Sequence, residues 1–145
     1  MIKITSEPLN PEEVTAQVRR DSNGAVITFL GTTRDFSEGR NVEYLEYEAY
    51  QPMAENMLQQ IAEELREKWD IDDFAVAHRV GRVDIGEISL VVALASPHRQ
   101  QAFEAGQYIV DRIKQIVPIW KKEFFEGGEV WVGSQADFNP ISVRS

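Results

Sequence analysis

The chain has 145 residues, of which 43% are apolar and 10% aromatic, and its formal net charge is −9. These values are typical of one folded domain with a buried core. There is no cysteine, which excludes disulfides, thiolate metal ligands and any reaction in which this chain carries sulfur on a cysteine. No stretch has the length of a membrane span and no signal-peptide pattern opens the chain, so we expect a cytoplasmic protein. The acidic charge argues against general nucleic-acid binding.

The N-terminal part predicts a short strand and then a helix. Residues 1–5 alternate in polarity as an edge strand does. Asn10 and Pro11 begin the helix, because Asn is a good N-cap and Pro fits the first helical position. We expect this helix to run to about Arg20.

Apolar patterning predicts the next elements. Residues 25–30 form a continuous apolar run, which predicts a strand buried on both faces, and the polar residues 31–41 predict a long connecting loop. Residues 42–50 alternate as a strand, and residues 54–69 carry the apolar stripe of an amphipathic helix. Further strands are expected at 74–80, 88–95, 119–125 and 130–132, with a loosely ordered tail at 133–145. The prediction is a single α+β domain over 1–145, with a mainly antiparallel sheet, two long helices and one shorter N-terminal helix.

The stretch from Ser96 to Lys122 carries the strongest functional signal. Ser96 is a good N-cap and Pro97 suits the first helical turn, so the pattern predicts a helix that starts there and stops at Pro118. Its apolar face is expected to consist of Phe103, Gly106, Val110, Ile113 and Val117.

Cationic side chains flank both ends of this predicted helix. His98 and Arg99 occupy its first turn, where the positive end of the helix dipole disfavours cations unless an anion gathers them. Lys114 and Lys121 lie around the other end. Residues 78–122 carry a net charge of +3 and the rest of the chain −12. This asymmetry is typical of a positive pocket that focuses a small anion, although charged residues on solvated faces would give the same count.

Lysine and arginine are the chemical groups that this chain offers. The sequence has no zinc-binding His or Cys spacing, no phosphate-binding glycine loop and no serine nucleophile elbow, so we expect no metal and no cofactor. Lys114, if partly desolvated near other cations, would have a depressed pKa and could serve as base, acid or amine nucleophile. The alternative is a purely structural contact of Lys114 with the helix C-terminus and Asp111.

Seven short motifs follow one another along the chain: FLGTTR at 29–34, LEYE at 45–48, HRVG at 78–81, IGE at 85–87, SPHR at 96–99, DRIK at 111–114 and PIWKKE at 118–123. In this order they resemble one protein family, the large, catalytic subunits of molybdopterin synthase. The resemblance covers nearly the whole chain from Phe29 to Glu123, and its specificity lies in the ordered combination. Thr32 stands where some members carry a lysine, so it is given no charged role.

The resemblance implies an α/β-hammerhead fold and a sulfurtransferase. Such an enzyme adds two sulfurs to cyclic pyranopterin monophosphate and so forms the dithiolene of molybdopterin. The sulfur donor is the C-terminal Gly-Gly thiocarboxylate of a small ubiquitin-like sulfur-carrier subunit. Two catalytic subunits form a homodimer at the centre of a heterotetramer, with one small subunit at each end.

The resemblance also implies roles for individual residues. Lys114 is the central catalytic lysine, and Lys121 lies beside the incoming thiocarboxylate. Arg34 binds the pterin or its phosphate, while His98 and Arg99 form an anion pocket that approaches the site of the neighbouring subunit. The remaining substrate-binding candidates are Thr32, Thr33, Lys122 and Glu123.

Two other functions fit the residues without the resemblance. The basic pocket could belong to a non-catalytic module that holds an anionic metabolite or a partner's tail. It could also belong to a phosphate-processing enzyme that uses the same cations. Loss of turnover with retained binding on substitution of Lys114 separates a catalyst from a binder.

Overall fold

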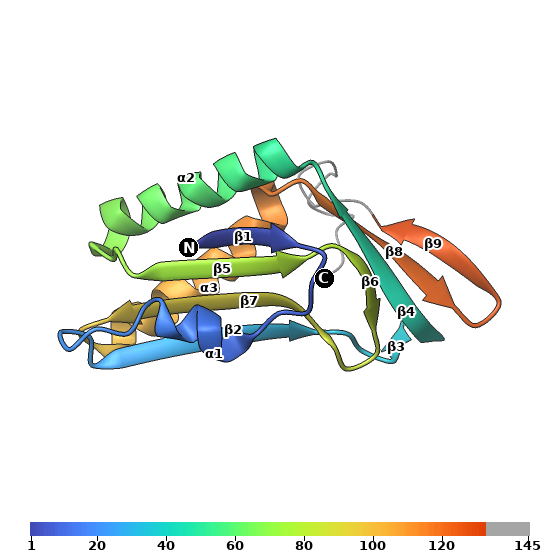
Figure 1. The fold of residues 1–145 in the computed structure, drawn as a ribbon, viewed down its shortest axis with the longest axis horizontal. Coiled ribbons are helices and arrows are strands. Elements are labelled where there is room, and N and C mark those ends of the chain that lie inside the picture. The colour runs from blue at the N-terminus through green and yellow to red at the C-terminus, as the bar shows by residue number, and fades with distance from the viewer. Residues whose placement is uncertain (133–145) are drawn as a thin grey trace.

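Two β-sheets and three helices make up residues 1–132, the part of the chain that the computed structural model describes (Figure 1). The predicted tail at 133–145 lies outside these residues. The helices are α1 (Pro11–Ala16), α2 (Gln51–Trp69) and α3 (Arg99–Ile116). The strands are β1 (Ile2–Thr5), β2 (Ala25–Thr32), β3 (Phe36–Ser37), β4 (Arg40–Ala49), β5 (Phe74–Arg79), β6 (Gly81–Asp84), β7 (Ile88–Ser96), β8 (Ile119–Phe125) and β9 (Gly128–Val132).

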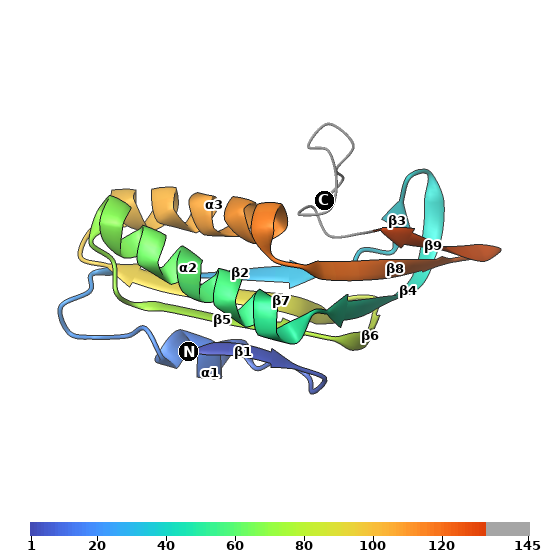
Figure 2. The same cartoon turned by 90° about the horizontal axis from the view of Figure 1, so that it is seen from above.

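The first sheet has the strand order β1-β5-β7-β2 and is sandwiched between helices. β1 pairs with β5 in parallel, and the other two pairings are antiparallel. Figure 2 shows α2 and α3 on one face of this sheet and α1 on the other. The side chains between the sheet and the two long helices form the main core, which includes Leu58, Ile61, Val92, Leu94 and Ile109.

The second sheet extends beyond the ends of the two long helices (Figure 1). Its order is β3-β4-β8-β9, and β6 pairs with β4 as well. β4 leads directly into α2, and α3 leads through Val117 and Pro118 into β8. These two connections join the long helices to the second sheet. The predicted α+β class with mainly antiparallel pairing is confirmed.

The N-terminal helix begins where the sequence predicts and ends earlier. The Asn10 side chain accepts hydrogen bonds from the backbone N–H groups of Glu12 and Glu13, which confirms the predicted cap. The helix ends at Ala16 instead of near Arg20. Val18 still packs into the core beneath the sheet, but it does so from a turn.

The prediction that residues 25–30 are buried on both faces is wrong. These residues form most of β2, which is the edge strand of the first sheet. Val26, Phe29 and Leu30 are each about 40% exposed, whereas the central strand β7 is buried along nearly its whole length. Both β2 and β7 consist of a continuous apolar run. Their burial differs because β2 lies at the edge of the sheet and β7 in its centre.

The long helix α3 also departs from its predicted start and face. Its N-cap is His98 rather than Ser96, because β7 continues to Ser96. The buried face consists of Ala102, Ala105, Ile109 and Ile113, while Phe103 is 66% exposed. Pro118 lies just past the helix end at Ile116, as predicted.

Short strands were missed in two places. Residues 31–41, predicted as a loop, extend β2 to Thr32 and contain β3, which pairs with the start of β4. β6 lies where no strand was predicted, and it pairs with Tyr44–Tyr47 of β4. β3 has two residues and β6 has one buried apolar side chain, Val83, so neither shows an alternating apolar pattern.

A charged cluster ties the two long helices together. Glu64 of α2 accepts hydrogen bonds from Arg112 of α3 at 2.9 and 2.8 Å and from the Tyr108 hydroxyl at 2.6 Å. The hydrogen bonds from Arg112 are the main reason why the pKa of Glu64 falls from 4.5 to about 2.

Replacing this carboxylate should weaken the helical layer in a pH-dependent way. A carboxylate with a depressed pKa contributes stability that is present above its unfolded pKa and lost as the pH falls through the folded value. We expect Glu64→Gln to lower the free energy of unfolding at pH 7 by about 1–2 kcal/mol, given the solvent access of both partners. The deficit should shrink between pH 4.5 and about pH 2. Urea titrations check this, with the exposed neighbour Glu63→Gln as control; equal loss in both variants would contradict it.

Candidate active site

A cavity of about 350 Å³ opens where the two sheets meet. One wall comes from the end of β2 and the segment that follows it, and the other from the inward faces of β4 and β8. The last turn of α3 closes it with Lys114. The residues that line it are Phe29, Leu30, Gly31, Thr32, Arg34, Phe36, Ser37, Val42, Leu45, Tyr47, Lys114, Lys121 and Glu123.

Two lysines from different elements share this cavity. Lys114 comes from α3, and Lys121 from β8 beyond the proline break. Burial lowers the pKa of Lys114, and the positive charges of Lys121 and Arg34 lower it further, while Asp111 acts weakly in the opposite sense. Burial likewise lowers the pKa of Lys121. The sequence-based expectation of a desolvated lysine among cations is met in this geometry.

One buried carboxylate moderates the positive charge. Glu123 is only 7% exposed, and its Oε2 lies 3.9 Å from Nζ of Lys121. Its charge opposes the burial effect on the pKa of Lys121. Within residues 1–132, Lys114 forms no ion pair with a carboxylate. The predicted structural pairing of Lys114 with Asp111 is therefore absent from this part of the chain. Asp111 instead accepts hydrogen bonds from Gln107.

The segment after β2 supplies the third cation. Arg34 is exposed at the cavity rim. Thr32 lines the cavity, but Thr33 does not: it is 4% exposed, and its backbone is bonded to Glu87 and Gly86. Thr33 thus anchors the segment that carries Arg34.

Lys122 occupies a different position from the other predicted site residues. Side chains alternate along β8, so Lys121 and Glu123 face the cavity while Lys122 lies on the opposite face of the sheet. There its ammonium stands 5.2 Å from the centre of the Phe124 ring, a cation–π contact. The expectation that Lys122 lines the site is therefore not supported for this chain.

His98 and Arg99 line a second cavity, of about 720 Å³, at the far end of α3. The helix has 18 residues and is therefore roughly 27 Å long, which separates these cations from Lys114 within one chain. Phe103 lines the same cavity. Gly24 borders it too, at a place where a Cβ would come within 2.7 Å of the Pro97 carbonyl. The structure thus divides the predicted residues between two places.

Sequence reasoning missed three polar residues behind the lysines. Tyr47 lines the cavity, His78 packs edge-on against its ring, and Ser89 interacts with its hydroxyl. His78 and Ser89 are 7% and 5% exposed. Polar side chains inside otherwise apolar strands were a visible signal, but one that most often marks ordinary hydrogen bonding.

The cavity combines its cations with a few neutral and acidic polar side chains. No three His, Asp or Glu side chains among them are grouped as metal ligands. No helix within residues 1–132 is long and apolar enough to cross a membrane. What the cavity can do is attract an anion, hold it between Arg34 and two lysines of depressed pKa, and move protons through those amines.

Comparison with known proteins shows which family the chain resembles. The family model for MoaE protein matches residues 4–116. The molybdopterin synthase catalytic subunit of Bacillus subtilis (strain 168) is 50% identical over 135 residues, which cover 93% of this chain and 86% of the relative. That of Halalkalibacterium halodurans is 45% identical over 134 residues, 92% of this chain and 86% of the relative.

Solved structures agree with the sequence comparison. The crystal structure of molybdopterin synthase from Staphylococcus aureus matches with a TM-score of 0.86 and 44% identity, over 90% of this chain and 95% of that one. A protein–protein complex of subunits 1 and 2 of molybdopterin-converting factor from Helicobacter pylori 26695 matches with a TM-score of 0.71 over 90% of this chain and 89% of that one. At 21% identity the latter shares the fold.

The fold and the relatives together define an α+β enzyme. More specifically, the chain belongs to the MoaE family, the catalytic subunits of molybdopterin synthase. It is a sulfurtransferase of molybdenum cofactor biosynthesis.

Repulsion among the cations in the cavity should lower the free energy of unfolding of the native chain. Replacing Lys114 by Met keeps the length of the side chain but removes a buried charge that Lys121 and Arg34 repel. We expect Lys114→Met to raise the free energy of unfolding at pH 7 by about 1 kcal/mol while abolishing activity. A lysine whose folded pKa is depressed regains stability as the pH rises through that value, so the gain should vanish at high pH.

Urea titrations at several pH values test this, with the exposed Lys3→Met as control. A Lys114→Met chain less stable than the native one at pH 7 would contradict the electrostatic account of the cavity.

Proposed function

We propose that the cavity catalyses sulfur transfer from a thiocarboxylate to cyclic pyranopterin monophosphate, forming the dithiolene of molybdopterin in the cytoplasm. The observation that carries this proposal is the pair of partly buried lysines from α3 and β8 facing one cavity beside Arg34. Both reactants are anionic, and each needs charge neutralisation in a partly dry site. The chain has no cysteine, so in this scheme the sulfur arrives from outside.

The sulfur donor in this proposal is the C-terminal Gly-Gly thiocarboxylate of a small ubiquitin-like sulfur-carrier subunit. The complex of two molybdopterin-converting factor subunits from Helicobacter pylori supports such a partner for this fold. A Gly-Gly tail suits a narrow cavity because it carries no side chains, and its terminal charge complements Lys121 and Lys114.

Each cavity residue then has a distinct role. Lys121, moderated by Glu123, binds the incoming thiocarboxylate. Lys114 stabilises charge and transfers protons as sulfur attacks the substrate, for which a depressed pKa is the useful property. Arg34, exposed at the rim, binds the pterin or its phosphate together with Thr32.

In this proposal, His98 and Arg99 of one chain act in the cavity of a second copy. They lie at the far end of α3 from Lys114, so one chain cannot gather all these cations. The exposed apolar side chains of the open edge strand β2, with Phe36 and Phe103, offer a surface for a homodimer. We propose that dimerisation brings His98 and Arg99 of one copy to the cavity of the other, within a heterotetramer.

A single-turnover assay tests the reaction. Native chain, cyclic pyranopterin monophosphate and a thiocarboxylated Gly-Gly partner are mixed, and the dithiolene product is detected. We expect Lys114→Ala to lower the rate at least a hundredfold, on the order of the effect of removing a positioned acid–base group, while partner affinity changes little. Lys3→Ala is the control. No product from the native chain with partner still bound would leave only a binding module, and phosphate release would indicate a phosphate-processing enzyme.

Mixing two inactive variants tests the shared site. Lys114→Ala and Arg99→Ala homodimers are each expected to be impaired. A mixed dimer keeps one site with both native residues, so exchange should restore roughly a quarter of native activity when subunits reassort at random. Rates are compared before and after subunit exchange. Activity that stays at the level of the separate variants, with exchange verified by mass spectrometry, would show that each chain works alone.

A further inference from the structure

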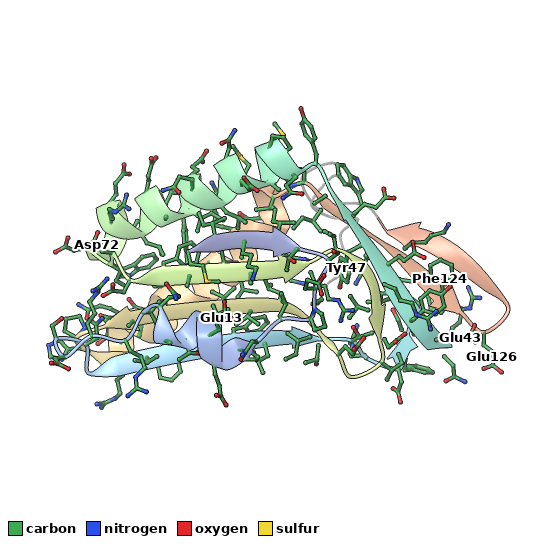
Figure 3. The ribbon with its side chains drawn as sticks, viewed as in Figure 1. Glu13, Glu43, Tyr47, Asp72, Phe124 and Glu126 are labelled. Carbon is green, nitrogen blue, oxygen red and sulfur yellow. The ribbon has the colours of Figure 1, made fainter. Side chains whose placement is uncertain are left out.

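Tyr47 connects the cavity to the protein behind it. It lies in β4 directly opposite Lys121 of β8, with both side chains on the cavity face of the second sheet. Directly opposite residues in antiparallel strands have Cβ atoms about 5 Å apart, so the phenol ring flanks the stem of Lys121. Figure 3 shows Tyr47 at the junction of the two sheets. Its ring is thus placed to determine where the Lys121 ammonium can lie.

The ring is held from behind by a neutral histidine. The centres of the His78 and Tyr47 rings are 5.1 Å apart, and their planes meet at 69°. Nδ1 of His78 lies 2.8 Å from the carbonyl oxygen of Arg79. A carbonyl only accepts, so Nδ1 carries the proton. Burial lowers the pKa of His78 to about 4, and the charge of Lys114 acts in the same direction. His78 is therefore an uncharged support that adds no further repulsion.

The hydroxyl of Tyr47 lies near Ser89, which acts to lower the pKa of the phenol. The Ser89 hydroxyl donates to the carbonyl of Gly31 at 3.3 Å. Gly31 itself lines the cavity near Arg34. The phenol is thus supported at its ring by His78 and lies close to Ser89 of β7.

We propose that Tyr47 is a positioning residue for the two lysines: its ring, supported by His78 and lying opposite Lys121, sets the place of Lys121 and keeps water from the cavity that it shares with Lys114. This role rests on the proposed sulfur transfer and adds a residue to it. Tyr47 acts through the lysines and takes no part in bond making. Burial raises the pKa of the phenol above its ordinary value, so Tyr47 is neutral at physiological pH.

The same strand carries a matched control. Tyr44 lies on the opposite face of β4, where its ring stacks on Phe124 at 4.3 Å and lies under Arg82 at 3.8 Å. Removing this ring takes a comparable contact from the same sheet without touching the cavity. A purely structural role for Tyr47 therefore predicts similar behaviour of the two tyrosines.

The experiment compares Tyr47→Leu, Tyr47→Phe and Tyr44→Leu in the full chain. The first readout is the pKa of Lys114 and Lys121, followed through the Cε chemical shifts of isotope-labelled lysine and assigned with Lys→Met variants. The second is the single-turnover rate at saturating partner and substrate. The charged and titratable groups that face the lysines are Arg34, Tyr47, His78, Asp111 and Glu123, and all but Tyr47 stay unchanged.

We expect Tyr47→Leu to raise the pKa of both lysines toward their unfolded values, because water enters, and to slow turnover about tenfold with partner affinity unchanged. Tyr47→Phe should keep the lysine pKa values and slow turnover about threefold, an effect that Ser89→Ala reproduces without adding to it. Tyr44→Leu should change neither readout.

Unchanged lysine pKa values in Tyr47→Leu, or equal shifts in Tyr44→Leu, would overturn the proposal. If Tyr47→Leu does not fold, Tyr47→Phe and Ser89→Ala decide it: effects on rate that add in full would exclude a joint role of the two hydroxyls and overturn the proposal. The titration needs no turnover, so failure of this inference is separate from failure of the proposed function, which would appear as no product from the native chain.

Discussion

The constraint on which the site depends is that three positive side chains lie close together in a partly buried cavity. Lys114, Lys121 and Arg34 repel one another there, and burial disfavours the charged forms of the two lysines. Such an arrangement persists only if the surrounding fold fixes the side chains independently. Here two stable elements do so, since Lys114 projects from a helix packed on the first sheet and Lys121 from a strand of the second.

The junction between the sheets is what turns these elements into a site. β4 and β8 leave the helical layer side by side, and the end of β2 approaches their inner faces to close the cavity. Tyr47, His78 and Ser89 fill this junction with neutral polar groups. The lysines therefore lie in a low-dielectric environment with no carboxylate that fully neutralises them. The buried Glu123, whose Oε2 lies 3.9 Å from Nζ of Lys121, reduces the positive charge at Lys121 alone. The two long helices have a separate charged cluster around Glu64, which joins them through Arg112.

The location of the remaining cations explains why one chain is an incomplete catalyst in the proposed mechanism. His98 and Arg99 sit at the opposite end of α3 from Lys114. The exposed apolar residues of β2 and Phe103 lie on surfaces that a second copy could cover. A shared site of this kind would couple activity to assembly, because a separated chain would retain the lysines but lose part of its anion-binding charge.

The sequence by itself determined the α+β class, the cap of α1 by Asn10, the break at Pro118 and the family, because local propensity and ordered motifs do not require knowledge of neighbours. It also selected Lys114, Lys121 and Arg34, which the fold brings to one cavity. Only the tertiary structure decided that β2 is an exposed edge, that Lys122 faces away, and that His98 and Arg99 lie apart from the lysines. The reason is physical: burial, strand register and the direction of a side chain depend on pairing partners distant in the chain, which a local pattern does not record.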